Sequence, residues 1–197
     1  MLTAKVFELT GPRQLVLNPS PLEDETLQDG DLLAQTIVSA ISPGTETAAY
    51  IGAPPLRPGR VYPRVVGYCN VARILKSRST RYASGDLILT NQSHRSHFII
   101  GDQKVLGAVS PAVSPEKAAM TYLYQLGYNA LWKGGFFPGY SVAAVGLGVI
   151  GLAAIVHLDA LMLALARLHH CAAGYVPRSD CGRTDKREAV AGAVDGS

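Results

Sequence analysis

The chain has 197 residues, 48% of them hydrophobic, and a formal net charge of +3. This length allows one large domain or two small ones with a buried core. The small charge, without a basic run interleaved with aromatic residues, argues against a nucleic-acid-binding protein. Three widely spaced cysteines (Cys69, Cys171, Cys181) argue against a disulfide framework and favour a reducing, cytoplasmic location.

Six short segments in the first half predict β-strands. They are rich in β-branched residues and separated by Gly, Pro, Asp and Ser, and they cover residues 4–9, 14–17, 31–42, 65–75, 86–90 and 96–100. The N-terminal segment alternates apolar and polar residues, so it predicts a strand and not a signal peptide. No long helical period interrupts the six. Residues 1–113 are therefore expected to form an all-β or partly open barrel domain.

The pattern changes to helices after residue 113. Ser114 is a good N-cap, Pro115 suits the first helical position, and an apolar stripe predicts a helix that ends at Gly134 and Gly135. A turn, a strand over residues 141–146 and a second helix from Val149 are expected next, up to residue 170. Residues 171–197 have no clear period and predict an irregular tail.

The stretch AAVGLGVIGLAA carries a G-x-G-x-x-G motif at Gly146, Gly148 and Gly151. The first glycine permits a tight strand-to-helix turn, the second a close approach to a pyrophosphate, and the third close packing of helix and strand. Backbone N–H groups at the start of the helix, including those of Val149 and Ile150, would then hold the phosphates. The alternative is a glycine-rich helix packed on a sheet.

The acidic residue that should bond the ribose hydroxyls is missing from its usual place. It is expected about 20 residues beyond the turn, where the chain has Leu165, Ala166, Arg167 and Leu168. If a loop and a strand were lost, Asp159 is the candidate for this acid, followed by a new helix. The same region, residues 142–168, is also the one candidate for a membrane segment. Asp159 in its middle argues against that reading, because a charge there is costly.

The order of these parts resembles the medium-chain dehydrogenase/reductase superfamily over about residues 5–158. The segments that carry the resemblance are VSAISPGTETAAY, YPRVVGYCNVARI, SGDLILTNQSHRSHFII and VAAVGLGVIGLAAI. The S-x-G-T-E form is similar to a branch with bacteriochlorophyllide dehydrogenase-like proteins. The resemblance implies an α/β chain in which a GroES-like β-barrel domain is followed by a Rossmann segment (114–170). That segment is incomplete, and the chain is expected to be truncated.

The resemblance also implies which residues would bind zinc, and the chain departs from each of them. The first cysteine position of zinc-dependent relatives matches Pro43, the Gly-His-Glu position reads Gly67-Tyr68-Cys69, and the third ligand position lies near Tyr122. Proline and tyrosine cannot replace thiolate and imidazole as zinc ligands. The four cysteines of the structural zinc lobe are also absent from the sequence. A zinc-independent protein is therefore expected, with no metal site.

Three hydroxyl groups are the candidate catalytic residues. Thr45 occupies the place of the hydroxyl that relays a proton in zinc-dependent relatives, but it is equally a turn residue. Tyr68 and Tyr122 replace zinc ligands, so they are expected to line one cleft, as a proton donor or as a plain aromatic wall. Glu46 is expected to hold the N-terminus of the helix that follows it.

Other polar residues have simpler interpretations. His94 and His97 have an H-x-x-H spacing, yet a strand would direct them to opposite faces, which favours a polar strand end over a metal site. Three arginines in a proline-rich loop (Arg57, Arg60, Arg64) attract anions or are merely solvated. Cys69 is expected to be a buried, small apolar residue.

Taken together, the sequence predicts an NAD- or NADP-dependent oxidoreductase that moves a hydride to or from a carbonyl, alcohol or activated alkene without zinc. Its expected partner is a small-molecule substrate, with a homo-oligomer as a further option, and not nucleic acid or a membrane. The alternative is a non-catalytic, truncated remnant that binds or recruits a partner. Activity is in doubt because a complete Rossmann domain has six strands.

Overall fold

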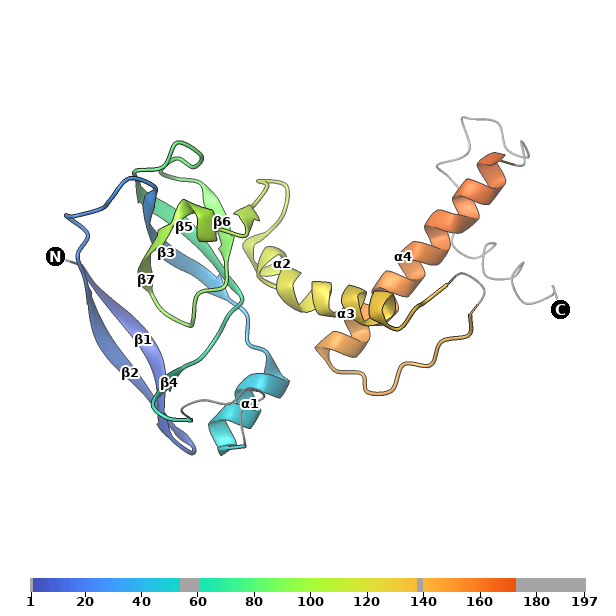
Figure 1. Cartoon of the computed structure of the whole chain (residues 1–197), viewed down its shortest axis with the longest axis horizontal. Coiled ribbons are helices and arrows are strands. Elements are labelled where there is room, and N and C mark those ends of the chain that lie inside the picture. Colours follow the sequence, from blue (N-terminus) through green and yellow to red (C-terminus); the bar gives the residue numbers. More distant parts are fainter. Residues whose placement is uncertain (1, 54–60, 138–139, 173–197) are drawn as a thin grey trace. The chain divides into compact units, whose positions relative to one another are not determined.

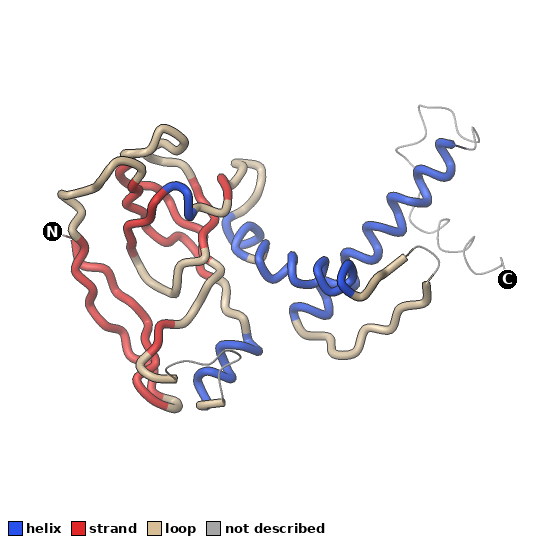
Figure 2. Tube along the Cα trace, viewed as in Figure 1, coloured by secondary structure: helices blue, strands red, loops and turns tan. Residues whose placement is uncertain are grey.

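The computed structural model describes residues 2–53, 61–137 and 140–172, and for residues 164–172 the backbone alone. The chain divides into two compact units, Met1–Leu123 and Tyr124–Ser197. Every strand among the described residues lies in the first unit, and the long helix α4 lies in the second (Figure 1; Figure 2). The expected fold class, a GroES-like β-barrel domain followed by an incomplete Rossmann segment, is confirmed. The predicted domain boundary after residue 113 stays a prediction.

Two antiparallel sheets build the first unit, and all six predicted strands occur in them. The smaller sheet has the order β2-β1-β4 and the larger one the order β7-β3-β5-β6-β8. The strands are β1 Leu2–Gly11, β2 Gln14–Leu22, β3 Asp31–Ser39, β4 Arg64–Val65, β5 Asn70–Ser77, β6 Leu87–Thr90, β7 His97–Gly101 and β8 Gly107–Ala108, with a 3₁₀ turn η1 at Asp102–Lys104.

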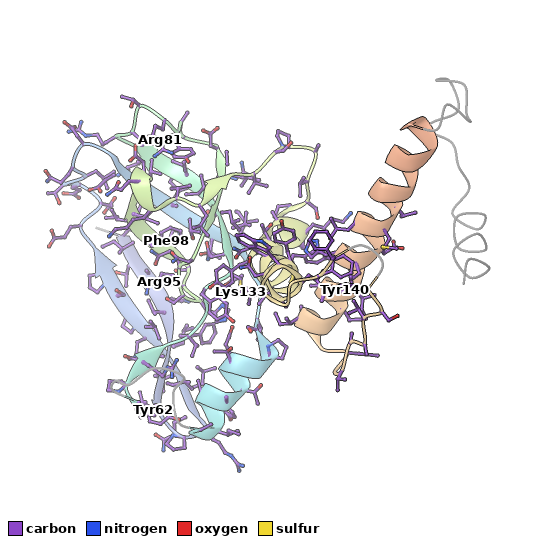
Figure 3. All side chains as sticks on the ribbon, turned by 45° about the vertical axis from the view of Figure 1, so that its right-hand side comes forward. Tyr62, Arg81, Arg95, Phe98, Lys133 and Tyr140 are labelled. Atoms are coloured by element: carbon purple, nitrogen blue, oxygen red, sulfur yellow. The ribbon has the colours of Figure 1, made fainter. Side chains whose placement is uncertain are left out.

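The core of this unit lies against the larger sheet. Leu32, Ile74, Ile88 and Phe98 each have 1% or less of their surface exposed and belong to one apolar cluster. They come from four different strands, so burying them ties the sheet together and stabilises it by the hydrophobic effect. Phe98 lies within the sheet part of the unit in Figure 3.

A short helix, α1 (Pro43–Ile51), lies between β3 and β4. No long helical period marks it, although a helix held by Glu46 was expected here. Its signals are short and local. The Glu46 side chain accepts a hydrogen bond from the Ser42 backbone N–H at 2.8 Å, and Gly52 closes the helix in the left-handed conformation, with φ at +85°. The Tyr62 hydroxyl donates a hydrogen bond to the Ala49 carbonyl and fixes the last turn.

The helix predicted to begin after Ser114 is present but broken. Ser114 caps α2 (Pro115–Ala119) by accepting a hydrogen bond from the Lys117 N–H, and α3 (Thr121–Lys133) follows after Met120. Gly134 and Gly135 end α3 as expected, with φ at +66° for Gly135. The N-cap and the glycine stop were therefore predicted correctly, and the break was not.

In the second unit, α3 packs closely against α4 (Val149–Ala172), and the two cross in Figure 1. A Cβ atom on Gly127 would lie 2.6 Å from the backbone nitrogen of Ala154, so only glycine permits this approach. The helix predicted from Val149 is confirmed, and it continues without a break past Asp159, so the separate helix considered after that residue does not form.

The strand predicted over residues 141–146 does not form. Residues 140–147 have no regular secondary structure, and Val145 is 99% exposed. A strand needs a neighbouring strand for its backbone hydrogen bonds, and the described part of this unit contains no second strand. Among the described helices, none is long and apolar enough to cross a membrane. The predicted tail lies outside the described residues, apart from the last two residues of α4.

Candidate functional site

Two of the three candidate catalytic hydroxyls are brought together in the first unit. The rings of Tyr68 and Tyr122 meet edge to face, with their centroids 5.3 Å apart and their planes at 70°. Tyr122 stands in the first turn of α3, and Tyr68 follows Gly67 in the segment between β4 and β5. An edge-to-face pair of this kind stabilises both rings. Tyr122 stays 37% exposed, which leaves it open to a ligand.

Thr45 is placed differently from the tyrosines. It is the third residue of α1 and its side chain is exposed. Helix α1 therefore holds Thr45 at its N-terminal end, where the first backbone N–H groups have no partner inside the helix. The structure leaves both interpretations of Thr45 open, a hydroxyl for substrate and a residue of the helix start.

The residues at the zinc positions do not fit a zinc ion. Pro43 is the first residue of α1 and offers no side-chain donor, and Tyr68 replaces an imidazole. Cys69 is buried, and burial raises the pKa of its thiol to about 11, followed by a smaller effect of Glu46. No group of three His, Cys, Asp or Glu side chains converges within the described part of the chain.

A hydrogen-bonded chain of three side chains lies in the first unit, and the sequence did not predict it. His94 Nε2 lies 2.7 Å from Glu46 Oε2, and His94 Nδ1 lies 2.6 Å from Ser39 Oγ. The side chains of Glu46 and His94 are each 12% exposed. Glu46 thus holds the start of α1, as expected, and binds His94 in addition.

The backbone around His94 is shaped to admit its ring. Gly67 has φ at +95°, and a Cβ atom there would lie 2.7 Å from His94 Cγ. His94 precedes β7 and is not part of it, so the expected opposite-face arrangement with His97 does not apply. His97 Nδ1 instead lies 3.1 Å from Ser96 Oγ. The three members of the chain are far apart in sequence, so no spacing could reveal them.

This chain of side chains can hold His94 in either protonation state. Ser39 Oγ lies 3.2 Å from the Cys69 carbonyl as well as beside His94 Nδ1, and it has one proton to donate. If Ser39 donates to the carbonyl, His94 donates from both ring nitrogens and is an imidazolium beside Glu46. If Ser39 donates to Nδ1, His94 is neutral. The orientation of the Ser39 hydroxyl therefore decides which of its two acceptors it binds.

The glycine turn in the second unit has the geometry that its spacing predicts, except for the strand. Gly146 has φ at +89°, and a Cβ atom on Gly151 would collide with the Gly146 carbonyl oxygen. Around Gly148, no atom lies within 4 Å of the place a Cβ would take. The Gly148 carbonyl accepts the first hydrogen bond of α4, from the Leu152 N–H, at 2.9 Å. The open space at Gly148 fits the close approach of a pyrophosphate.

The backbone N–H groups of Val149 and Ile150 begin α4, where a helix has no internal partner for them. These residues of the turn and first helical positions are the ones that would hold a dinucleotide. The candidate for the ribose-binding acid is distant from them along the helix. Asp159 lies about 15 Å along the helix from Val149 and is exposed. Of the three loop arginines, Arg57 and Arg60 lie outside the described residues, and Arg64 belongs to β4.

No protein-family model and no curated protein sequence matches the chain. Solved structures do match it. A 2R,3R-butanediol dehydrogenase from Bacillus subtilis has a TM-score of 0.65 and 15% identity, with 80% of this chain and 55% of that chain covered. For a short chain alcohol dehydrogenase from E. coli, complexed with NADH, the TM-score is 0.62 at 15% identity, over 84% and 54%.

A third match is a variant of Etr1p, the 2-enoyl thioester reductase of Candida tropicalis, in complex with NADP and crotonyl-CoA. Its TM-score is 0.55 at 16% identity, over 69% of this chain and 44% of that one. The chain spans about half the length of the structures it matches. At these identities the likeness concerns the fold. Over the part that these matches cover, the chain shares the fold of these dehydrogenases and of the enoyl thioester reductase.

Proposed function

We propose that the chain is part of an NAD- or NADP-dependent oxidoreductase that transfers a hydride to or from a carbonyl, alcohol or activated alkene without zinc. The observation that carries the proposal is the glycine turn. Gly146 needs its left-handed conformation, Gly151 needs the absence of a side chain, and Gly148 leaves the backbone open to a ligand. A helix that merely packed on a sheet would not require this combination.

Under this proposal, Gly146, Gly148, Val149, Ile150 and Gly151 hold the dinucleotide. The nicotinamide supplies the hydride chemistry when it is bound. The protein then has to bind the substrate and manage a proton. Tyr68 and Tyr122 are the proposed proton donors, because they stand at the positions of zinc ligands in zinc-dependent relatives and their rings pack against each other. Thr45 is the proposed hydrogen-bonding partner of a substrate oxygen.

The remaining partners follow from the same proposal. The proposed substrate is a small molecule. The proposed function is compatible with a homo-oligomer and requires neither nucleic acid nor a membrane. We keep the reducing cytosol as the compartment, because Cys69 is a buried free thiol and not part of a disulfide. The choice between NAD and NADP depends on residues that contact the ribose, which the glycine turn does not include.

The proposal is tested by titrating the purified chain with NADPH and with NADH while Trp132 fluorescence is followed. Trp132 lies in the last turn of α3, in the same unit as the glycine turn, and is 73% exposed. Saturable binding at micromolar concentrations is the expected result. If a folded sample shows no binding up to millimolar concentrations, the proposal is wrong.

A second candidate function is a non-catalytic protein that recruits a partner through its second unit. The specific observation is the segment 140–147, where Val145 is 99% and Leu147 68% exposed, with no strand paired to the segment among the described residues. Backbone without a strand partner, with exposed apolar side chains, favours pairing with another chain. Sedimentation velocity with and without NADPH separates the two functions, since a recruiting protein assembles without the dinucleotide.

A further inference from the structure

The first unit contains a pocket of about 660 Å³ that none of the proposed catalytic or cofactor residues lines. It lies between the hairpin of β1 and β2 and the helix α1, with residues from the segment before β7 at its other side. Pockets that bind small organic ligands typically have volumes of about 300–1,000 Å³. The pocket therefore has the size of a small-molecule site.

One wall of the pocket is apolar. In the hairpin, Phe7 pairs with Leu17 and Leu9 pairs with Leu15, so the four side chains lie on one face. Phe7, Leu15 and Leu17 are 40–50% exposed, although large apolar side chains on a shared face are normally covered. An aliphatic or aromatic group in the pocket would remove this surface from water.

Two basic residues, Arg95 and Lys5, also line the pocket. Arg95 lies on the segment that leads into β7 (Figure 3), is half-buried, and donates from Nε to the Ser93 hydroxyl at 2.8 Å. Burial lowers the pKa of its guanidinium. Within the described residues, no carboxylate lies within ion-pair distance of Arg95 or Lys5.

The acidic groups closest to Arg95 have hydrogen-bond partners of their own. Glu46 lines the pocket, and its carboxylate is bound by His94 and by the Ser42 N–H. Glu8, on the other face of the hairpin, accepts a hydrogen bond from the Asn18 amide at 2.6 Å. A partly buried cation without a carboxylate is costly unless an anion binds to it. The pocket thus combines an apolar wall with an unmatched positive charge.

We propose that this pocket binds a small amphipathic carboxylate, with its acid group on Arg95 and Lys5 and its alkyl chain on the apolar face of the hairpin. Arg95 suits the acid group because a guanidinium binds a carboxylate through parallel hydrogen bonds. Ser39 and His94 also line the pocket, but they bond to each other and to groups of the protein, so the binding of the acid group depends on Arg95 and Lys5. The site involves no part of the glycine turn, so it stands whether or not the chain binds a dinucleotide.

The first experiment is isothermal titration calorimetry of the full chain with decanoate below its micellar concentration. Octanoate and hexanoate test the apolar wall, and decan-1-ol tests the requirement for charge. The expected result is one saturable site, an affinity that falls about fourfold for each methylene removed, and binding of decan-1-ol at least about tenfold weaker than that of decanoate. No saturable binding up to millimolar concentrations, or equal binding of the alcohol, overturns the proposal.

Two matched pairs of variants locate the site. Arg95→Gln is compared with Arg73→Gln, which removes an exposed arginine outside the pocket. Leu17→Gln is compared with Leu75→Gln, which changes an exposed leucine of β5 outside the pocket. Arg95→Gln and Leu17→Gln should each weaken decanoate binding about tenfold or more, with little effect of the controls, and Arg95→Lys should recover part of the affinity. Equal affinities within either pair place the ligand elsewhere and refute the proposal.

Discussion

Replacing Glu46 should destabilise the first unit more than any other single change to a polar residue described above. Its carboxylate accepts two hydrogen bonds, one from the Ser42 N–H at 2.8 Å and one from His94 Nε2 at 2.7 Å. The side chains of Glu46 and His94 are each only 12% exposed, so water does not replace these bonds easily. A lost helix cap costs about 1 kcal/mol, and a lost hydrogen bond to a charged group about 1.5–3 kcal/mol.

Glu46→Ala should therefore lower the free energy of unfolding by about 3 kcal/mol. Glu46→Gln keeps an acceptor for the Ser42 N–H and loses the charge, so it should cost about half as much. The assay is urea denaturation followed by far-UV circular dichroism, on Glu46→Ala, His94→Ala and the double variant. This double-mutant cycle should give a coupling energy of about 2 kcal/mol between Glu46 and His94. If Glu46→Ala changes stability by less than about 0.5 kcal/mol, the hydrogen-bonded chain does not stabilise the unit.

Three further predictions concern the core, the helix pair and the cysteine. Phe98→Ala should lower the free energy of unfolding, measured by urea denaturation, by about 3–5 kcal/mol, because Phe98 is only 1% exposed. The control Phe137→Ala changes a side chain that is 69% exposed and should alter this free energy by less than about 0.5 kcal/mol. Equal effects of the two variants would contradict the assigned core. Gly127→Ala should destabilise the second unit by about 1–3 kcal/mol, measured by Trp132 fluorescence in urea, because its Cβ would meet the backbone of α4. A gain of about 1 kcal/mol, usual for this change in an open helix, would show that the helices do not pack there. With the other two cysteines changed to serine, Cys69 should react with iodoacetamide at pH 8 at least about a hundredfold more slowly than in urea, since burial raises its pKa from 9.0 to about 11. Equal rates would place the thiol at the surface.

The strands and the glycine turn were predictable because their signals are local. Alternating apolar residues with β-branched side chains mark a strand wherever a partner strand exists, and this holds for all six predicted segments of the first unit. The N-cap at Ser114 and the stop at Gly135 depend on the backbone of a few adjacent residues. The spacing of Gly146 and Gly151 likewise reports one tight turn.

The errors arose where distant residues decide the structure. Residues 141–146 have the composition of a strand, but a strand forms only against another strand, and the described part of the second unit has none. Helix α1 has no long helical period in its sequence. It is stabilised by the Glu46 side chain at its start, and by the Tyr62 hydroxyl and the left-handed Gly52 at its end. His94 was expected at a polar strand end, because nothing local connects it with Ser39 or with Glu46.

The most direct measurement of the central claim is the NADPH affinity of Gly148→Ala beside that of Gly107→Ala. Neither position has an atom within 4 Å of an added Cβ, so both variants should fold like the natural chain. If the glycine turn binds the dinucleotide, Gly148→Ala should weaken NADPH binding about tenfold or more, because the methyl group keeps the pyrophosphate from the backbone, and Gly107→Ala should leave the affinity unchanged. Equal affinities of the two variants, or no NADPH binding by the natural chain, would contradict the account.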